Sequence, residues 1–492
     1  MGAKSLARRI WHESGLESLH TTGPDAWLII LNRSCRMFAY GASSLILALF
    51  FAELKISDEQ IGLFMTLTLA GDVLLSLLMT LIADRVGRRR TLFFGSCLMI
   101  FSGVTFATCE NYWVLLLAAV VGVISATGGD FGPFRAIEES TVSELTDRNT
   151  RADVLVWYVT MSSLGASIGI EVSGRIIETL RGLDGWTLLD AYHACFWLYA
   201  IMGLVNMVSV ALMSKKCELK QKTEAVDAPA VDAGETDRLL ADPNSDDNNS
   251  VTTSVSSKPP TTPKKSWISQ ISRESLSVML LLWLLLMVDS LADGMVSMSL
   301  TSYYMDQKFH LPKDKLGDMQ AASFFLASVS TVFSGPLARH IGLVNTMVFT
   351  HIPSSAAVLL FPLPKTVAMT FFLLLVRVGL NNMDQAPRAA LIAAVVKPEE
   401  RTAVLGITGM LRTLAMTVGP SITGLLAGGG RFWVAYVVAG SLRLAYDLGL
   451  FAMFVNIKLH KHEPVVVAQD DAVEGVEGRD GNRRRSDEDE ER

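Results

Sequence analysis

The sequence has 492 residues, of which 50% are hydrophobic and only 19% are charged, with a formal net charge of −6. Its mean hydropathy is +0.35, and apolar runs long enough to cross a bilayer core of about 30 Å recur along most of the chain. These properties exclude a soluble enzyme, a secreted disulfide scaffold and a nucleic-acid binder with a basic face. Five scattered cysteines form no legible disulfide or metal-binding pattern.

Twelve apolar runs of spanning length follow one another along the chain, in two sets of six. The first set covers 27–52, 61–83, 91–109, 112–140, 154–177 and 192–213. The second set covers 276–304, 316–338, 344–363, 366–396, 404–427 and 431–457. The run 112–140 is too long to lie wholly in lipid, so we expect its end in the cytosol. The sequence therefore predicts an all-α membrane protein with twelve transmembrane helices in two six-helix bundles.

Polar segments flank and separate the two predicted bundles. A short N-terminal segment, 1–24, precedes the first bundle at 25–213, and the second bundle covers 275–457. The intervening segment 214–274 is rich in Ser, Thr and Pro and has no hydrophobic periodicity. The tail at 458–492 is acidic and ends in RRRSDEDEER. We expect both of these segments to be disordered.

Basic residues in the short loops predict the orientation of the chain in the membrane. The densest basic cluster of any short loop is 84–90, between the second and third helices, and Arg148 and Arg151 follow the fourth. The loop at Glu110 has none. Both termini and the linker are therefore predicted to be cytosolic. The linker sequence ETDRLL (235–240) matches an acidic dileucine sorting pattern, so the plasma membrane and an endosomal or vacuolar membrane are both candidate locations.

The two halves repeat one another at a nearly constant spacing. Four sets of residues recur in the second half. Gly62 and TLIADRVG (80–87) match Gly317 and GPLARHIG (335–342) at an offset of 255 residues, and Arg36 and Gly41 match Asp289 and Gly294 at 253. The stretch DFGPFRAIEE (130–139) matches DQAPRAALIA (384–393) at 254, and Gly169 and Gly174 match Gly419 and Gly424 at 250. Such an ordered set of matches indicates that one six-helix unit has been duplicated in parallel orientation.

Two parallel six-helix halves joined by a cytosolic linker are typical of secondary transporters, whose substrate site lies between the halves. The stretch ADRVGRRR (83–90) resembles the loop signature between helices two and three of the major facilitator superfamily. The resemblance extends over roughly 25–213 and 275–457 and implies a rocker-switch carrier. The signature departs from the usual pattern at Thr80, where a glycine is typical, and the fifth helix lacks the Gly-Pro element of proton-coupled drug antiporters.

The resemblance also implies a gating role for the loop after the second helix. In this role Asp84, Arg85, Gly87 and Arg88 hold the cytosolic side closed in the outward-open state and release it on inward opening. Arg85 and Arg88 are expected to reach acids at neighbouring helix ends, and Asp84 to cap a following helix or to pair with a basic residue. The alternative is that this positive charge only sets the topology.

Charged residues within the predicted spans are candidate substrate and proton sites, because a charge at the bilayer centre costs several kcal/mol. Asp72 precedes Asp84 by twelve residues, about 18 Å along a helix, which places it near mid-membrane. It is either a partner of a neighbouring arginine or a proton-binding carboxylate. Arg36 and Asp289 occupy equivalent repeat positions and could form an ion pair across the pseudo-twofold axis that breaks and re-forms as the halves rock. Alternatively, Arg36 holds an anionic group of the substrate, or each of these charges belongs to a permanent buried pair. Asp293 follows one turn after Asp289 on the same helix face.

Other intramembrane charges have a possible partner three or four residues away on their own helix. These local pairs are Asp384 with Arg388, Arg443 with Asp447, and Arg135 with Glu138 and Glu139, the two glutamates being interpreted mainly as gate or loop contacts. Asp130, which the repeat matches to Asp384, is a secondary candidate. Glu171 and Arg412 are interpreted as lone charges on the fifth and eleventh helices and are expected to face the cavity.

The principal hypothesis is a secondary active transporter of a small polar or charged organic solute, coupled to protons through Asp72, with export favoured over uptake. Two alternatives remain: a proton-coupled uptake carrier for a sugar or an organic anion, and a transporter-like nutrient or metabolite sensor that signals through the linker. The sequence has no HExxH, GxSxG or Cys/His cluster, so we expect no enzymatic activity, cofactor or metal. The expected partners are the solute, H⁺ and the lipid bilayer, without nucleic acid, and the expected state is a monomer.

Overall fold

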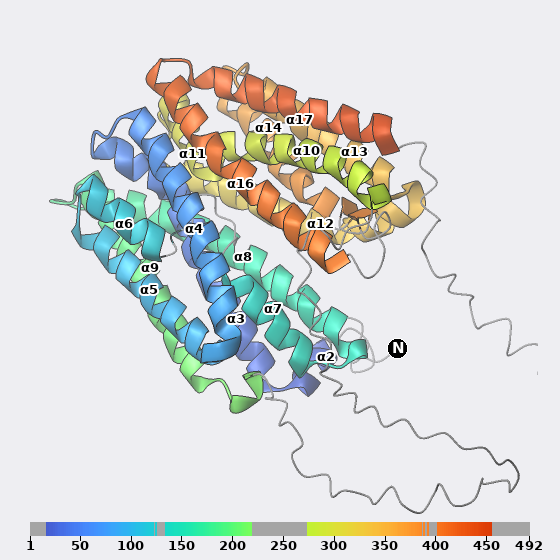
Figure 1. Cartoon of the computed structure of the whole chain (residues 1–492). Helices are drawn as coiled ribbons and strands as arrows, with labels where there is room; N and C mark the ends of the chain where they lie inside the picture. The colour runs from blue at the N-terminus through green and yellow to red at the C-terminus, as the bar shows by residue number, and fades with distance from the viewer. Residues whose placement is uncertain are drawn as a thin grey trace, which may run out of the picture.

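The computed structural model describes residues 16–122, 124, 133–218, 273–385, 387–388, 391–392 and 401–454, and they form two helical bundles (Figure 1). The first bundle contains α2 (Leu16–Thr22), α3 (Pro24–Glu53), α4 (Asp58–Val86), α5 (Arg88–Thr108), α6 (Tyr112–Gly122), α7 (Pro133–Leu145), α8 (Arg148–Arg181), α9 (Leu188–Leu212) and a 3₁₀ turn, η1 (Lys215–Cys217). The second contains α10 (Arg273–Met295), α11 (Met298–Phe309), α12 (Lys313–Ile341), α13 (Leu343–Leu360), α14 (Val367–Asn381), a 3₁₀ turn η3 (Asn382–Asp384), α16 (Arg401–Gly428) and α17 (Phe432–Phe454).

Most of the predicted spans correspond to one helix each. Within the described residues, eight helices are long and apolar enough to cross a membrane, or nine if α10 and α11, which are bent by 43°, form one span. The shorter α6 and the more polar α12 and α16 occupy the three other predicted positions. The all-α architecture in two bundles is confirmed, whereas the count of twelve crossings stays a prediction.

Three predicted runs differ from the structure. The described residues of 112–140 belong to two helices, since α6 ends at Gly122 and α7 begins at Pro133, a residue suited to a first helical turn. The run 276–304 is the bent pair α10 and α11. The run 366–396 is helical in α14 only to Asn381 and continues as the turn η3. Hydropathy alone does not register the break between α10 and α11 because the apolar residues Met295, Val296 and Met298 continue through it.

Polar side chains satisfy the backbone at the break between α10 and α11. Thr423 donates its hydroxyl to the carbonyl oxygen of Met295 at 2.7 Å, and Arg377 donates to the carbonyl oxygen of Val296. Arg377 also donates to Oγ1 of Thr301 at 2.8 Å. A free carbonyl costs several kcal/mol in lipid, so a break is tolerated only where other groups supply donors.

Glycines at equivalent repeat positions make equivalent contacts within each half. A Cβ added to Gly41 on α3 would lie 2.2 Å from the backbone oxygen of Ala166 on α8. A Cβ added to Gly294 on α10 would lie 2.1 Å from the backbone oxygen of Met416 on α16. Small residues let membrane helices approach closely, so the sequence repeat corresponds to a repeated helix crossing.

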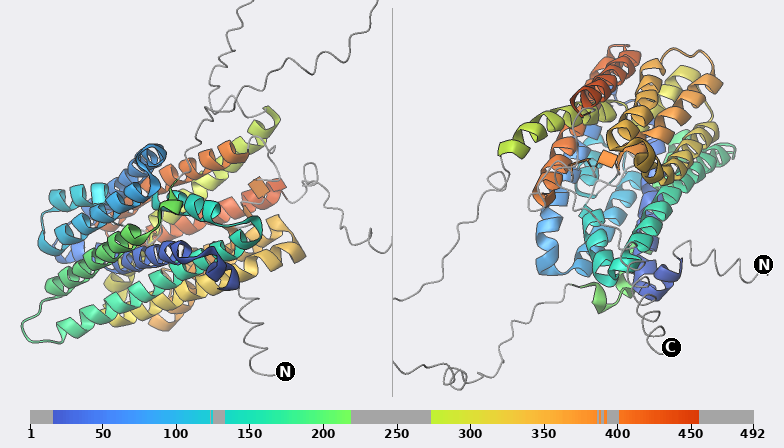
Figure 2. Two further views of the ribbon diagram at one scale, coloured as in Figure 1. Left: turned by 90° about the horizontal axis from the view of Figure 1, so that it is seen from below. Right: turned by 90° about the vertical axis from the view of Figure 1, so that its right-hand side faces the viewer.

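The contacts between the two halves obey the same symmetry. Gly62 on α4 faces Gly424 on α16, and Gly317 on α12 faces Gly174 on α8, with Cβ-to-Cα separations of 2.8 Å and 3.3 Å. Figure 2 shows α8 and α12 side by side across the boundary. These repeat-related crossings give the boundary its pseudo-twofold character.

Hydrogen bonds close the boundary at one end of the molecule. Tyr303 on α11 donates to Asp58 at 2.6 Å, and Ser421 on α16 donates to Thr66 at 2.8 Å. From this end α4 and α16 diverge toward Val86 and Arg401 (Figure 1). The halves are therefore joined at the end that holds Asp58 and separate toward the end that holds the basic loop 84–90.

The first half begins and ends at the same face of the bundle. The backbone N–H of Ser214, just after α9, donates to Asp25 at the start of α3 at 2.8 Å. Glu218 in turn accepts from the backbone N–H of Arg88 at 2.7 Å. The prediction that 214–274 is disordered is therefore wrong for 214–218, because these polar groups anchor them to helix ends. Residues 219–272 and the tail 458–492 lie outside the described part of the chain.

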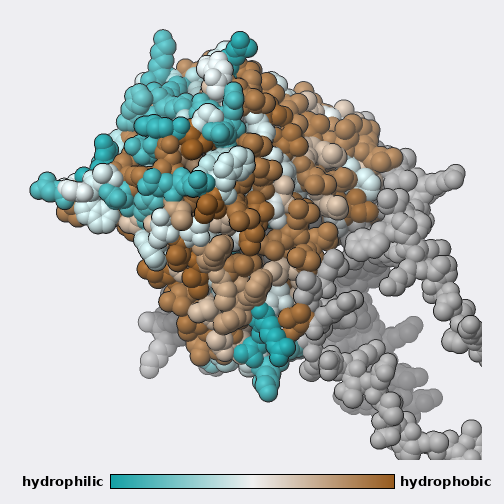
Figure 3. Space-filling model, turned by 60° about the vertical axis from the view of Figure 1, so that its left-hand side comes forward, coloured by the Kyte–Doolittle hydropathy of each residue, from teal (hydrophilic) through white to brown (hydrophobic). Residues whose placement is uncertain are grey.

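The surface carries an apolar band between more polar regions (Figure 3). Large apolar side chains are exposed on several helices, including Leu74 and Leu77 on α4, Phe94 on α5 and Leu284 on α10. A soluble monomer rarely exposes such a continuous apolar surface. The band is suited to the hydrocarbon core of a bilayer, and with the apolar helices it shows a multi-pass membrane protein.

The thiol of Cys217 in η1 is expected to resist alkylation. Burial, followed by the charge of nearby Asp25, raises the pKa of this thiol to about 12, which lowers its thiolate fraction at pH 7. Relative to an ordinary thiol the fall is roughly a thousandfold. Maleimide labelling of detergent-solubilised single-cysteine proteins, read by mass spectrometry, compares Cys217 with Cys109 as the control. Labelling of Cys217 at the rate of Cys109 would contradict the prediction.

Candidate functional site

A buried ion pair joins α3 to α7 inside the first half. Two guanidinium nitrogens of Arg36 donate to the two carboxylate oxygens of Glu138, at 2.9 Å and 2.6 Å. Tyr158 on α8 donates its hydroxyl to the same carboxylate at 2.8 Å. The pair is inaccessible to solvent, and its bidentate geometry is the strongest form of this interaction.

Aromatic rings surround this ion pair. The guanidinium of Arg36 lies 4.8 Å from the ring centre of Phe134, and that of Arg33 lies 5.0 Å from the ring centre of Tyr158. Cation–π contacts of this kind help to stabilise cations that are removed from water. Arg33 was not identified from the sequence as a candidate site residue. Its position three residues before Arg36 places both arginines on one helix face.

Two sequence predictions about these residues are wrong. Arg36 does not pair with Asp289 across the pseudo-twofold axis, because Glu138 of its own half takes both of its terminal nitrogens. Glu138 is not a loop contact either. Its neighbour Glu139 takes the exposed local pairing with Arg135, at 2.7 Å. Consecutive residues on a helix point in different directions, so one glutamate is buried and the other reaches solvent.

Asp72 on α4 is buried without a salt bridge among the described residues. Its Oδ1 atom accepts no hydrogen bond from them. Tyr40 and Tyr199, whose rings stack at 6.5 Å, lie within electrostatic range of the carboxylate. Among the described residues, Asp72 therefore has no arginine partner of the kind that the first alternative requires. A carboxyl group in this setting is suited to being protonated.

A second charged cluster joins α10, α13, α16 and α17 in the other half. Asp293 accepts from Arg443 at 3.1 Å. Asp289 lies 4.0 Å from Arg412 and 3.7 Å from His351. Asp293 and Arg412 keep 22% and 29% of their side-chain surface exposed, whereas Asp289 keeps 1%. The cluster therefore has a solvent-accessible front and a buried back.

His351 on α13 holds the back of this cluster together, and sequence reasoning missed it. Its Nδ1 lies 2.7 Å from Asp447, its Nε2 lies 2.8 Å from Arg443, and Ser355 donates to the same Asp447 at 2.7 Å. The predicted local pair of Arg443 with Asp447 is wrong, because each residue finds its partner on another helix. The feature of the sequence that points to it is a single histidine inside the apolar run 344–363.

The remaining intramembrane candidates fall into local and peripheral contacts. Asp384 and Arg388 form the predicted pair, which is buried. Arg412 faces the charged cluster and donates to Ser290 at 3.0 Å. Glu171 lies at the boundary between the halves, where it binds Arg175 at 2.6 Å. Asp130 lies outside the described residues.

Arg175 extends the Glu171 contact across the boundary. Its other terminal nitrogen reaches Asp318 of the second half at 2.9 Å. Glu171 therefore belongs to an exposed chain of ion pairs at the joined end of the molecule. It contributes to a contact between the halves and does not face a cavity as predicted.

The basic loop contributes ordered contacts of its own. Arg88 binds Glu144 at the end of α7 at 2.8 Å, so it reaches an acid at a neighbouring helix end. Gly87 has a φ of 106°, a conformation that favours glycine. Glu218 caps the N-terminus of α5 by accepting from the Arg88 N–H. The side chains of Asp84 and Arg85 lie outside the described part of the structure.

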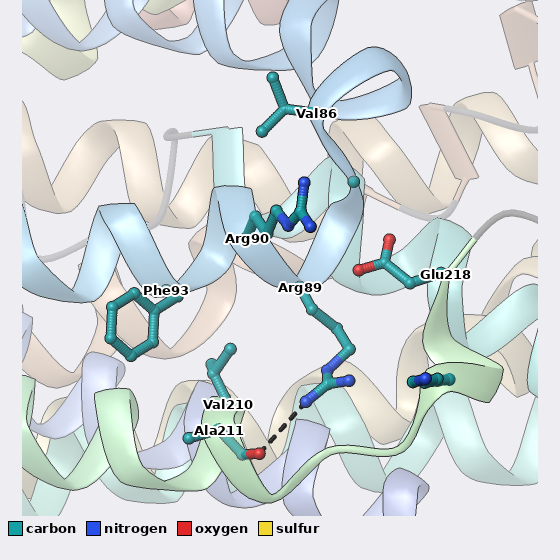
Figure 4. Close-up of a pocket in the computed structure, with 9 residues that line it drawn as sticks. Val86, Arg89, Arg90, Phe93, Val210, Ala211 and Glu218 are labelled. Atoms are coloured by element: carbon teal, nitrogen blue, oxygen red, sulfur yellow. Dashed lines mark hydrogen bonds between the residues drawn. The ribbon is translucent and has the colours of Figure 1, made fainter.

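A shallow pocket of about 580 Å³ lies beside this loop (Figure 4). Arg89, Arg90, Phe93 and Glu218 line it, and Arg89 donates to the backbone oxygen of Ala211 at 3.2 Å. The pocket is confined to the end of the first half and is separate from both buried charge clusters. It is therefore part of the loop architecture and not the space between the halves.

The described residues contain no group of three or more His, Cys, Asp or Glu side chains placed to hold a metal ion. The two clusters instead offer buried carboxylates, guanidinium groups and one imidazole. Such groups bind charged or polar solutes and exchange protons.

Comparison with known proteins identifies the family. The model of the Major Facilitator Superfamily matches residues 29–283 and 282–473. The chain is 32% identical over 425 residues to an uncharacterized membrane protein of Saccharomyces cerevisiae, covering 86% of this chain and 92% of that protein.

Two solved structures share the fold. The nucleoside transporter NupG has a TM-score of 0.63 at 11% identity, covering 89% of this chain and 100% of that chain. A bacterial homolog to the human lysosomal transporter Spinster has a TM-score of 0.61 at 14% identity, covering 89% and 98%. The chain belongs to the Major Facilitator Superfamily and is a multi-pass membrane transporter, not an enzyme.

Proposed function

We propose that this chain is a proton-coupled secondary transporter of a small polar or charged organic solute, working by alternating access. Family membership supports the secondary-transporter class. The chemistry of the solute, the coupling ion and the direction are proposals that rest on the charged interior.

The solute class is argued from the front of the charged cluster in the second half. Asp293 and Arg412 present opposite charges there and remain partly accessible to solvent. A purely lipophilic solute would displace the water that solvates the exposed parts of both charges and offer no polar contact in its place, which is costly. A solute with a hydrogen-bonding or ionic group compensates them, so a polar or charged molecule is favoured.

Proton coupling is argued from Asp72, and this is the observation that carries the proposal. Its carboxylate is buried and has an oxygen with no hydrogen-bond donor among the described residues. An isolated buried carboxylate is costly when ionised, so its protonation responds to the access of water from either side. Alternating access then converts a pH gradient into a sequence of proton uptake and release.

Alternating access is supported by the shape of the boundary between the halves. The halves are joined near Asp58 and Tyr303 and diverge toward the basic loop (Figure 1). With the predicted orientation, in which that loop is cytosolic, this arrangement is inward-open. The contact of Arg88 with Glu144 lies within one half, as expected when a gate at that end is released.

The test of proton coupling uses the full chain in proteoliposomes with an imposed pH gradient of either polarity. We expect at least one member of a broad panel of polar solutes to accumulate against its gradient, and the polarity that drives outward movement tests the proposed export. Absence of gradient-driven flux for the whole panel would contradict proton coupling.

The Asp72→Asn variant tests the role of this carboxylate. We expect it to lose gradient-driven accumulation while retaining solute exchange at equal pH, because the amide keeps the shape but cannot be ionised. Asp184→Asn is the matched control, since Asp184 is exposed in a loop. Full gradient-driven accumulation by Asp72→Asn would remove Asp72 from the coupling role.

A further inference from the structure

Charged groups from three other elements surround His351. Asp289 approaches from α10, Asp384 from η3, and Arg443 and Asp447 from α17. The ring of Tyr446 stands edge-on to the imidazole at 5.6 Å. Ser355, on the same helix as His351, completes the shell through its bond to Asp447.

The contacts of the two ring nitrogens define the protonation state in this conformation. A guanidinium group can only donate hydrogen bonds, so the Nε2 atom of His351, 2.8 Å from Arg443, acts as an acceptor. The Nδ1 atom therefore carries the hydrogen and donates to Asp447 at 2.7 Å. The imidazole is neutral here, and Arg443 occupies the position at which a second proton would bind.

A proton on Nε2 would place two donors against each other and force Arg443 to withdraw. Both groups have an alternative acceptor close by. Asp289 lies 3.7 Å from Nε2 of His351, and Asp293 already lies 3.1 Å from the other terminal nitrogen of Arg443. On protonation His351 therefore gains Asp289 as a partner, and Arg443 gives up the imidazole and keeps Asp293.

The balance of charge favours this exchange. Asp384 and Arg388 neutralise one another, and Arg377 is directed to the backbone of Val296 and to Thr301. The remaining carboxylates are Asp289, Asp293 and Asp447, against the two guanidinium groups of Arg412 and Arg443. One proton on His351 makes the opposite charges equal in number.

The exchange reaches the solvent-accessible front of the cluster. Arg412 lies 4.0 Å from Asp289. When the imidazolium of His351 binds Asp289, the attraction between Asp289 and Arg412 becomes weaker. Arg443 at the same time neutralises Asp293 more fully. A proton at the back thus makes the front more cationic, because Arg412 is freed while Asp293 is compensated.

We propose that His351 is a proton-binding switch whose protonation moves Arg443 from the imidazole to Asp293 and frees Arg412 to bind an anionic group of the solute. This inference rests on the proton-coupled transport proposed above and adds to it a second titrating group, in the half opposite Asp72. It also narrows the solute to one that carries a negative charge.

The direct test observes the imidazole itself and needs no solute. Histidine ring nitrogens are labelled with ¹⁵N in the full chain in lipid nanodiscs, and the His351 signal is the one lost in His351→Gln. We expect it to change from the neutral Nδ1–H form to the imidazolium between about pH 8 and pH 5. In Asp447→Asn the change should move to lower pH, since a carboxylate that favours the charged ring is removed. A signal that stays neutral throughout, or one unaffected by Asp447→Asn, would overturn the inference.

The functional test separates this inference from the proposed function. With an anionic solute from the panel, transport at equal pH on both sides is expected to vary about tenfold between pH 5 and pH 8 in the wild type and less than about twofold in His351→Gln. His193→Gln is the control, because this histidine lies in the other half and binds the backbone oxygen of Phe106. If the wild type shows gradient-driven flux but His351→Gln keeps the pH dependence of the wild type, the switch is refuted and proton coupling stands. If the wild type shows no gradient-driven flux, proton coupling itself is refuted.

Discussion

Oxidation of a Thr66→Cys, Ser421→Cys double variant should stop transport, and reduction should restore it. The two hydroxyl oxygens lie 2.8 Å apart on α4 and α16, one from each half. A disulfide, with an S–S bond of about 2.05 Å, needs only a small further approach. Alternating access requires this end to open, so a covalent link across it holds the molecule in the conformation described above.

The crosslinking experiment has controls within the same chain. It is performed without the native cysteines, and each single variant should remain active under oxidation. The control protein keeps Cys97 as its one native cysteine and adds Met207→Cys; in the native chain the sulfur atoms of Cys97 on α5 and Met207 on α9 lie 3.8 Å apart within one half. We expect that link to leave transport intact. Transport by the oxidised Thr66–Ser421 protein, with crosslinking verified on a gel, would show that this end does not open.

Removing either partner of the Arg36–Glu138 pair should destabilise the protein by about 3–5 kcal/mol, because the partner left behind is a buried charge without compensation. The pair is fully enclosed and bidentate. Arg36→Met and Glu138→Leu are each expected to lower the unfolding temperature in detergent strongly. The double variant Arg36→Met, Glu138→Leu should be more stable than either single variant, since neither charge remains.

The neighbouring pair Arg135–Glu139 is the matched control. Its two residues are four apart on the single helix α7, and their side chains are 49% and 38% exposed. Arg135→Ala is therefore expected to cost less than about 1 kcal/mol. If Arg36→Met proves as mild as Arg135→Ala, the buried pair does not stabilise the first half; additive losses in the double variant would show that the two side chains act independently.

The fold was largely predictable because hydropathy and small residues act locally. Gly41 and Gly294, 253 residues apart, indicated a duplicated unit, and both lie at equivalent close helix crossings. Any larger residue at these positions would collide with backbone atoms of the neighbouring helix. The close crossing therefore requires glycine, and the glycine is visible in the sequence. The break after Met295 was missed because its stabilising groups, Thr423 and Arg377, are far away in the chain.

The pairing of charges was predictable only in part. Asp384 and Arg388 pair as a four-residue helical spacing suggests. The same spacing fails for Arg443 and Asp447, which pair with Asp293 and His351 instead. A local pair on a helix contributes only about 0.2–0.5 kcal/mol, whereas a buried charge without compensation costs several kcal/mol. Burial on packed helices therefore overrides the local preference.

The sequence by itself determined that this chain is a duplicated, helical membrane transporter, because spanning length, apolar composition and glycine spacing are properties of each segment. Only the tertiary structure decided that Arg36 binds Glu138, that Asp72 has an oxygen without a donor among the described residues, and that His351 sits between Asp447 and Arg443. Electrostatic energy depends on distance and on exclusion of water, and both are set when helices distant in the chain pack together.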